Sequence, residues 1–346
     1  MKVSVLNLVQ LREGQSYKDA IDDMVVLAKQ VEKLGYERYW IAEHHNMKTV
    51  ASSATDLLME HALANTSKIR VGSGGVMLPN HAPYIVAERY GTLEVLYPNR
   101  VDLGLGRAPG TDGQTARAIR RTENLYPDFA ADLAELRGYF EDTHPVHAYP
   151  AAGLDIPFYI LGSSTDSAYL AAELGLPYVF ASHFAPAMLE EAVAIYRRNF
   201  KPSKHLERPY VMVGANAILA TSNEEAVTLK NSLIQMFLNI VSGNQAGLQP
   251  PKESEEEVWK DYVQTNKVPH FGPIAFERED LLYREKAVMQ NMSAMSLVGD
   301  KKNVRQQLIE LKQKVDVDEL IVTGYIYDHV AQLKSFELLA EVVSEL

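Results

Sequence analysis

The amino-acid sequence predicts an α/β protein and, within that class, a (β/α)8 barrel. Strand-like and helix-like segments alternate regularly along the 346 residues, which is the pattern of parallel strands joined by helices. Several of the strands are apolar almost throughout, as strands buried on both faces must be. The length also suits one barrel with insertions. An open doubly wound sheet is the alternative, because periodicity by itself cannot prove that a sheet closes.

The first four strands are expected at residues 3–8, 38–42, 68–78 and 100–106. Between the first two, apolar residues recur at helical spacing over 16–34, and Gly35 follows as a stop. The segment "SSATDLLMEHALANT" reads as the second helix. Pro83 opens a third helix and Pro98 ends it.

Four further strands are expected at residues 157–161, 177–182, 210–220 and 319–324, and a last helix at about 328–345. One segment, 243–285, breaks the alternation and is rich in Pro, Gly and charge. A connection of this length inside a compact domain is either an active-site cover or a mobile insertion. We therefore predict one domain, 1–346, with an insertion at about 243–285 between strands seven and eight.

Composition excludes several classes of function. The chain has no cysteine, so disulfides, thiol catalysis and thiolate metal sites are ruled out. It has no run of 18 apolar residues, and its start is interpreted as a first strand instead of a signal peptide. The net charge of −11 argues against partners such as nucleic acid or an anionic membrane. A cytoplasmic location is expected.

In an α/β barrel the active site lies at the carboxyl ends of the strands. The second strand ends in Glu43, His44 and His45. Either histidine is a candidate for proton transfer or hydrogen bonding beside a ligand. One of them, His45, can instead be structural, because neighbours on a strand point in opposite directions. A metal site is not favoured, since no H-x-H or H-E-x-x-H spacing occurs.

An anion-binding feature follows the fifth strand. The segment "LGSSTDSAYL" runs from a strand end directly into a helix, with Ser163, Ser164 and Ser167 at the junction. Free backbone N–H groups and hydroxyls at a helix start form a cradle for an anion. The alternative is an ordinary helix cap, for which Ser and Thr are common. His183 follows strand six and Tyr325 follows strand eight, but neither residue belongs to a recognised motif.

Arginine and glycine mark the third and fourth strand ends. Arg107 lies between glycines in "GLGRAPG", and guanidinium groups hold phosphate in a bidentate manner. Arg117, followed closely by two more arginines, belongs either to the same anion site or to a solvated helix face. Glycine weakens a strand, so Gly74 and Gly75 in "GSGG" indicate a bulge or the close approach of a ligand.

Three segments together resemble the bacterial luciferase-like flavin-dependent monooxygenase family. They are "WIAEHHNMKTVASSATDLL", "RVGSGGVMLPNHAPYIVAERYGTLEVLYPNRVDLGLGRAPGTDGQTARAIRR" and "LVGDKKNVRQQLIEL" with "DELIVTGYIYDHVAQLKSFELLAEV". The resemblance runs over the whole chain and is weakest over 243–285. The combination is specific, because strand two carries E-H-H, strand three G-S-G-G-V-x-L-P and strand four G-x-G-R-x-P-G, in that order.

The resemblance implies an enzyme that uses reduced FMN and O2 to oxygenate a small organic substrate, in the manner of an alkanal monooxygenase. His44 matches the histidine that interacts with the reduced flavin. The residues that match the flavin-binding positions are Gly74, Gly75, Arg107, Arg117, Ser163, Ser164 and Ser167. The glycine pair matches a non-proline cis peptide under the flavin ring, and a side chain at Gly75 would then occupy the place of the ring.

The resemblance also implies a homodimer, formed through the helices after strands two and three, and a separate flavin reductase as the source of reduced FMN. Light emission is not expected, because Gly106 stands where true luciferases carry a reactive cysteine. Three other functions stay open. They are hydride transfer with a deazaflavin or flavin on the same fold, flavin binding without catalysis, and metal-dependent hydrolysis built on His44 and His45.

Overall fold

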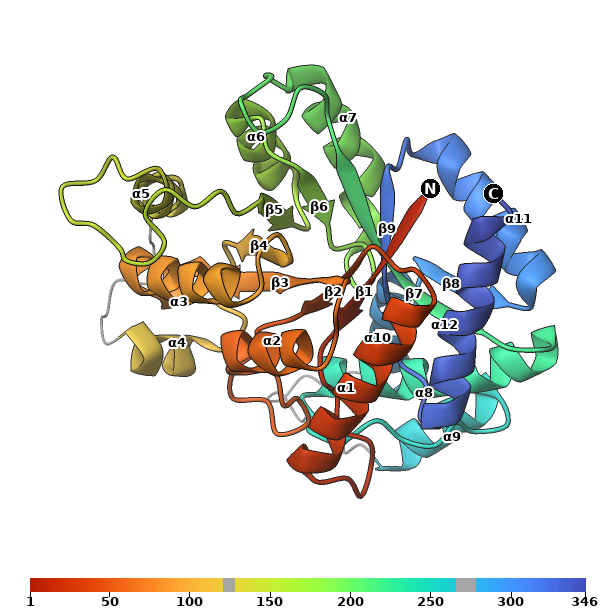
Figure 1. Cartoon of the computed structure of the whole chain (residues 1–346). Helices are drawn as coiled ribbons and strands as arrows, with labels where there is room; N and C mark the ends of the chain where they lie inside the picture. The colour runs from red at the N-terminus through yellow and green to blue at the C-terminus, as the bar shows by residue number, and fades with distance from the viewer. Residues whose placement is uncertain (121–127, 266–277) are drawn as a thin grey trace.

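The computed structural model describes residues 1–120, 128–265 and 278–346. Its strands form a closed parallel barrel with the helices outside it (Figure 1). Eight strands make the ring in the order β1-β2-β3-β4-β5-β6-β7-β9, and β9 pairs with β1 to close it. The barrel and its eight predicted strands are confirmed. Their bounds are Lys2–Asn7 (β1), Arg38–Ile41 (β2), Arg70–Met77 (β3), Val101–Gly106 (β4), Phe158–Gly162 (β5), Tyr178–Phe180 (β6), Val211–Leu219 (β7) and Glu319–Thr323 (β9).

A ninth strand, β8 (Ser296–Gly299), was missed by the sequence prediction. It pairs with the second half of β7, where Asn216 lies beside Ser296, whereas β9 pairs with the first half of β7. The long strand β7 therefore has two successive neighbours on one side. The sequence predicted no strand between 220 and 319, so β8 is an addition to the eight expected strands.

Local signals explain where the helices begin and end. Ser16 caps α1 and forms a capping box with Asp19, and Gly35 follows the helix with φ +78°. Pro83 is the first residue of α3. The helices are α1 (Tyr17–Lys33), α2 (Thr55–Ala64), α3 (Pro83–Leu96), α4 (Gly113–Arg120), α5 (Phe129–Phe140), α6 (Thr165–Leu174), α7 (Leu189–Asn199), α8 (Asn223–Ser242), α9 (Glu255–Thr265), α10 (Arg278–Met292), α11 (Lys301–Lys314) and α12 (His329–Ser344).

The interior of the barrel is polar at one end and apolar further along. At the amino ends of the strands, Arg38 donates to both carboxylate oxygens of Glu319 at 2.7 and 3.0 Å and to Asp102 at 2.9 Å. Above this layer, a buried apolar cluster fills the barrel with Leu6, Trp40, Ala42, Tyr159, Val179, Met212 and Ile321. These residues form the floor beneath the carboxyl ends of the strands.

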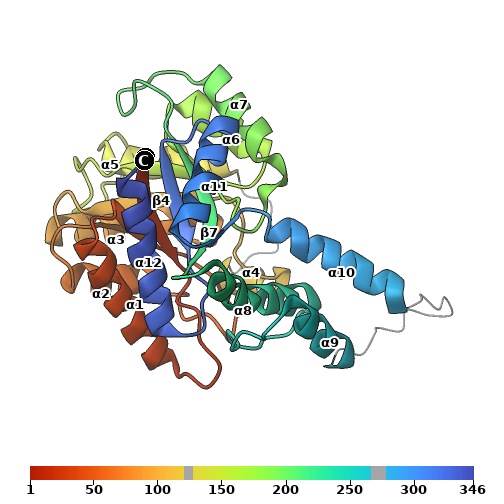
Figure 2. The same cartoon turned by 90° about the vertical axis from the view of Figure 1, so that its right-hand side faces the viewer.

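The segment that the sequence marked as an insertion, 243–285, contains α9 and the first part of α10. Both helices pack on α8 and lie together at one side of the barrel (Figure 2). A buried cluster joins the three helices, with Phe237, Val258, Tyr262 and Met289 among its members. Residues 266–277 lie outside the described part of the chain. Among the described residues, no helix is both long and apolar enough to span a membrane.

Candidate active site

A cavity of about 410 Å³ opens at the carboxyl ends of the strands, above the apolar floor. Its lining contains most of the residues that the sequence singled out, and these are His44, Gly74, Arg107, Ser163, Ser164 and Ser167. Two of the predicted site residues, Gly75 and Arg117, do not line it. Arg117 is exposed on α4. The barrel therefore brings residues of four different strand ends to one place.

One end of the cavity is a helix start with free hydrogen-bond donors. Ser164 is the N-cap of α6, yet its side chain makes no capping bond. The serines at the starts of α1 and α8, Ser16 and Ser222, both accept a bond from a backbone N–H of the first turn. The Ser167 hydroxyl donates to the Ser164 carbonyl at 2.9 Å. The first-turn N–H groups of α6 are thus left for another acceptor, which favours the anion cradle over the ordinary cap.

Arg107 lies directly after β4, beside this helix start. Its guanidinium donates to Oδ2 of Asp166 from both terminal nitrogens at 3.3 Å. The two side chains are 58% and 69% exposed, so the pair is weak and solvent-screened. A bound phosphate can therefore replace Asp166 as the partner of Arg107 at small cost.

The glycine pair of β3 has the geometry that the resemblance implied, with one correction. The Gly74–Gly75 peptide bond is cis, and the register between β3 and β4 shifts between Ser73 and Val76. Only Gly74 lines the cavity. A Cβ on Gly75 would lie 2.8 Å from the carbonyl oxygen of Gly104 on β4. The expectation that a side chain at Gly75 would occupy the ring's place is wrong, because it would collide with the neighbouring strand.

His44 faces the cavity, whereas its neighbour His45 does not line it. Burial lowers the pKa of His44 below its ordinary value, against the opposing effects of the Gly110 backbone and the Glu43 charge. The imidazole is therefore neutral at pH 7 and can both donate and accept a hydrogen bond. The alternation expected along the strand end separates the two histidines into different environments.

Glu43 is buried behind His44 and holds a small polar network. The Nε2 atoms of His45 and His81 lie 2.7 and 2.8 Å from its Oε1, and the Met77 backbone N–H donates to Oε2 at 3.1 Å. Burial alone raises the pKa of Glu43, but the hydrogen bonds from His45 and His81 and the charge of His81 outweigh it and bring the pKa to about 2. Glu43 is thus a carboxylate that fixes the end of β2 to the end of β3.

The same three residues, Glu43, His45 and His81, could also be considered as metal ligands, because their ligand atoms all lie within 4.8 Å of one another. Both Nε2 atoms approach one carboxylate oxygen at hydrogen-bond distance. Ligand atoms of one tetrahedral zinc ion, each about 2.0 Å from the metal, would instead be about 3.3 Å apart. The geometry therefore favours a hydrogen-bonded network. His270, another histidine of the chain, lies outside the described residues.

Sequence reasoning did not find the apolar wall of the cavity. It is formed by side chains from the loop after β2, from the loop after β6 and from α8 and α10, and they are Met47, Val50, Phe184, Met236, Phe237, Ile240 and Met292. No motif marks such residues, because their contribution depends on where the long β7–β8 connection folds back. Among the described residues that line the cavity, Arg107 is the only one with a charged side chain at neutral pH, because His44 and His183 are neutral there.

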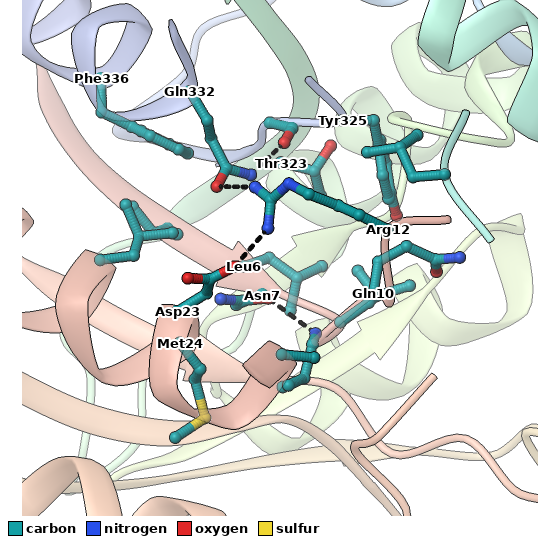
Figure 3. Close-up of a pocket in the computed structure, with 17 residues that line it drawn as sticks. Leu6, Asn7, Gln10, Arg12, Asp23, Met24, Thr323, Tyr325, Gln332 and Phe336 are labelled. Atoms are coloured by element: carbon teal, nitrogen blue, oxygen red, sulfur yellow. Dashed lines mark hydrogen bonds and ion pairs between the residues drawn. The ribbon is translucent and has the colours of Figure 1, made fainter. Parts of the chain in front are cut away.

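A second, small cavity of about 40 Å³ lies next to the first and shares Leu6, Leu8, Gln10 and Tyr325 with it. Figure 3 shows Arg12 between Asp23 and Gln332 at this place. The guanidinium donates to Asp23 at 2.7 Å and to Gln332 at 2.8 Å, so it connects the loop after β1 to α1 and α12. Arg12, Asp23 and Gln332 line the small cavity and not the larger one.

The fold and the site together give a parallel barrel with a cavity at the carboxyl ends of its strands, lined by the start of α6, by Arg107 and by the imidazole of His44. A family model described as luciferase-like monooxygenase matches residues 1–318. A luciferase-like monooxygenase of Escherichia coli (strain K12) is 45% identical over 347 residues, covering 99% of this chain and 97% of the relative. The chain belongs to the luciferase-like monooxygenase family, as the sequence motifs indicated.

Solved structures agree with this fold. Apo-MsnO8 superposes with a TM-score of 0.83 at 30% identity, covering 99% of this chain and 98% of its own. The oxygenating constituent of 3,6-diketocamphane monooxygenase from Pseudomonas putida, solved in complex with FMN, has a TM-score of 0.67 at 17% identity, covering 100% and 98%. Enzymes described as dependent on coenzyme F420 share the fold too, at 14% and 17% identity.

Proposed function

We propose that this protein is an FMN-dependent monooxygenase, which uses reduced FMN and O2 to oxygenate a small organic substrate. The observation that carries the proposal is the joint lining of one cavity by the uncapped start of α6, Arg107, Gly74 and His44. An anion cradle at one end and a largely apolar body suit a phosphorylated, flat heterocycle. Membership of the family supports the same conclusion.

The residues present fit FMN. The α6 backbone N–H groups, Ser163, Ser164 and Arg107 would hold the phosphate, and Gly74 would let the ring approach the backbone of β3. Ser167 supports this cradle through its bond to the Ser164 carbonyl. In this proposal Gly75 contributes through the shape of the bulge, and Arg117, which does not line the cavity, contributes only positive charge on the surface of α4. Reduced FMN, when bound, supplies the electrons and the site at which O2 is activated.

The protein's own tasks are binding, orientation, the exclusion of water and the control of one proton. The wall formed by Met236, Phe237 and Ile240 excludes water from the cavity. His44, neutral and held by the strand end that Glu43 anchors, can give or take a hydrogen bond at its side chain. The cavity leaves the organic substrate an apolar environment next to this imidazole.

The proposal extends to the partners. A separate flavin reductase would deliver reduced FMN in the cytoplasm, and two copies of the chain would associate through α2 and α3. Apolar side chains on these helices are exposed, with Leu57 at 68% and Leu96 at 58%, and such a surface favours a protein partner. Sedimentation of the wild type and of Leu57→Glu tests this: the variant should sediment as a monomer, and a monomeric wild type would contradict it.

The test of the main proposal is turnover under ¹⁸O2. The protein is supplied with photoreduced FMN and with a panel of uncharged probes, namely n-alkanals, a ketone and a thioether. Incorporation of one ¹⁸O atom into a probe, measured by mass spectrometry, is the expected result. Purified protein that binds oxidised FMN but transfers hydride without consuming O2 would establish the hydride-transfer alternative. Binding without any turnover would leave a flavin-binding protein.

A further inference from the structure

A second histidine, His183, lies in the cavity, and the sequence motifs gave it no role. It follows β6 and is 8% exposed. Its main chain is fixed by the next strand, because the Asn216 side-chain amide donates to the His183 carbonyl at 2.8 Å. Asn216 is itself fully buried and accepts a bond from Thr323 at 2.8 Å. The position of His183 is therefore set by β7 and β9 together.

The imidazole ring is pressed against a glycine of β7. A Cβ built on Gly214 would lie 2.5 Å from Nδ1 of His183, so a side chain at this position would force the imidazole ring to shift. Glycine in the interior of an apolar strand weakens it and marks a close approach. Here the approaching group is the His183 ring. The Ser182 hydroxyl, which donates to the Gly214 carbonyl at 2.5 Å, holds the two segments at this distance.

The two ring nitrogens have different surroundings. Nδ1 is completely buried and has no hydrogen-bond partner among the described residues. Nε2 is not buried in this way and has no hydrogen-bond partner in the described part of the chain, so it is the nitrogen left open to the cavity that His183 lines. A buried N–H with no acceptor is rarer than an acceptor with no donor. The ring therefore carries its proton on Nε2, where a bound molecule can accept it.

The charge state supports this arrangement. Burial, and in second place the charge of His44, lower the pKa of His183 to about 4. At neutral pH the ring is thus an uncharged donor. A histidine kept only for packing would bond at least one nitrogen to the protein, and an apolar residue would fill the same space without an unpaired group. The unpaired donor points to a partner that arrives with the ligand.

We propose that His183 is a second functional imidazole of this site, which donates a hydrogen bond from Nε2 to an uncharged acceptor of the molecules bound in the cavity. The acceptor is a carbonyl-type oxygen or a ring nitrogen, carried either by the flavin or by the organic substrate. This inference rests on the proposed flavin-dependent function, because that function supplies the ligand.

The first experiment measures the tautomer directly. Long-range ¹H–¹⁵N correlation spectra of the protein labelled at histidine, assigned with His183→Gln, distinguish the Nε2–H form from the Nδ1–H form. We expect a neutral Nε2–H ring at pH 7, with a shift of the Nε2 resonance when oxidised FMN or n-decanal is added. A charged ring, an Nδ1–H ring, or a ring insensitive to both additions overturns the proposal.

The second experiment uses matched variants. His183→Phe keeps an aromatic ring and removes the donor, whereas His183→Gln retains an N–H at a similar reach. Gly214→Ala leaves the histidine in place but pushes its ring aside. His147→Phe, at an exposed histidine in the loop before β5, is the control for loss of a histidine. Thermal unfolding of each variant identifies any that fail to fold.

The two sources of the acceptor give different results. If the flavin carries it, His183→Phe and Gly214→Ala weaken binding of oxidised FMN by about 3–10-fold, and His183→Gln restores most of the loss. If the substrate carries it, FMN affinity stays unchanged, while kcat/KM for n-decanal falls by a similar factor and recovers in His183→Gln. Unchanged values in both assays, or an equal loss in His147→Phe, overturn the proposal. If the wild type binds no flavin, the proposed function is refuted. The proposal for His183 is then judged by the tautomer measurement alone.

Discussion

The guanidinium of Arg107 lies 3.3 Å from Oδ2 of Asp166, the second residue of α6. In the proposed complex the phosphate of FMN would have to take the place of this carboxylate. Asp166→Asn is therefore expected to tighten FMN binding, by no more than about 5-fold, because exposed ion pairs are weak. Fluorescence titration with FMN and with riboflavin measures it. An equal gain for riboflavin, which has no phosphate, would contradict the explanation.

The same phosphate contact predicts a loss when the arginine is removed. Arg107→Ala should weaken FMN binding by about 1.5–3 kcal/mol, the range for hydrogen bonds to a charged group. Riboflavin binding should change little. Arg107→Lys, which keeps the charge but loses the bidentate geometry, should lie between the two. If Arg107→Ala affects both flavins alike, the side chain does not contact the phosphate.

His44 and His45 are expected to differ in their effect on coupling. His44→Ala should still bind FMN, because the phosphate contacts lie on other strands, and should still consume O2 when supplied with reduced FMN. The fraction of O2 that reaches an organic product should fall by about 10²–10⁴-fold, the usual contribution of a positioned acid or base. The missing O2 should appear as hydrogen peroxide, which is assayed at the end of turnover.

His45→Ala is the comparison for this measurement. Its ring is bonded to Glu43 outside the cavity, so we expect a loss of stability larger than any loss of coupling. A reversed order, in which His45→Ala uncouples the reaction and His44→Ala does not, would show that the proton group was assigned to the wrong histidine.

Glu43 makes stability depend on pH in the acid range. Its pKa is about 2 in the folded protein and near 4.5 when unfolded, so the unfolded state binds the proton more readily between these values. The stabilisation is present above about pH 4.5 and is lost as the pH falls toward 2. It amounts to about 3 kcal/mol. The difference in unfolding free energy between the wild type and Glu43→Gln should therefore shrink from pH 6 to pH 3. A constant difference would contradict the assigned pKa.

Arg12 is expected to stabilise the junction of the loop after β1 with α1 and α12 (Figure 3). Its side chain is 9% exposed, and its partner Asp23 is 25% exposed. Arg12→Met should lower the unfolding free energy by about 1–3 kcal/mol, less than for a fully buried pair because water reaches Asp23. Lys18→Met, which removes an exposed partner of Asp22 on the same helix, is the matched control and should have little effect. Equal losses in urea titration would argue against a role for burial.

Much of the fold could be predicted because its signals are local. The alternation of apolar strands and helices, the glycine stop after α1 and the proline start of α3 each depend on a few neighbouring residues. The four-residue strand β8 could not be predicted, since it exists only because the second half of β7 offers unpaired backbone groups. The apolar wall from α8 and α10 was missed because it depends on where the long connection after β7 folds back.

By itself the sequence determined which residues stand at the strand ends, and therefore His44, Gly74, Arg107 and the serines after β5 as candidates for one site. Only the tertiary structure decided how these side chains are partnered. Glu43 meets His81, and His183 meets Gly214, from different strands. Arg117 stays on the surface of α4, away from the cavity lining. The physical reason is that order along a chain determines which residues share a strand end, whereas burial, tautomer and charge depend on atoms that closure of the barrel brings together.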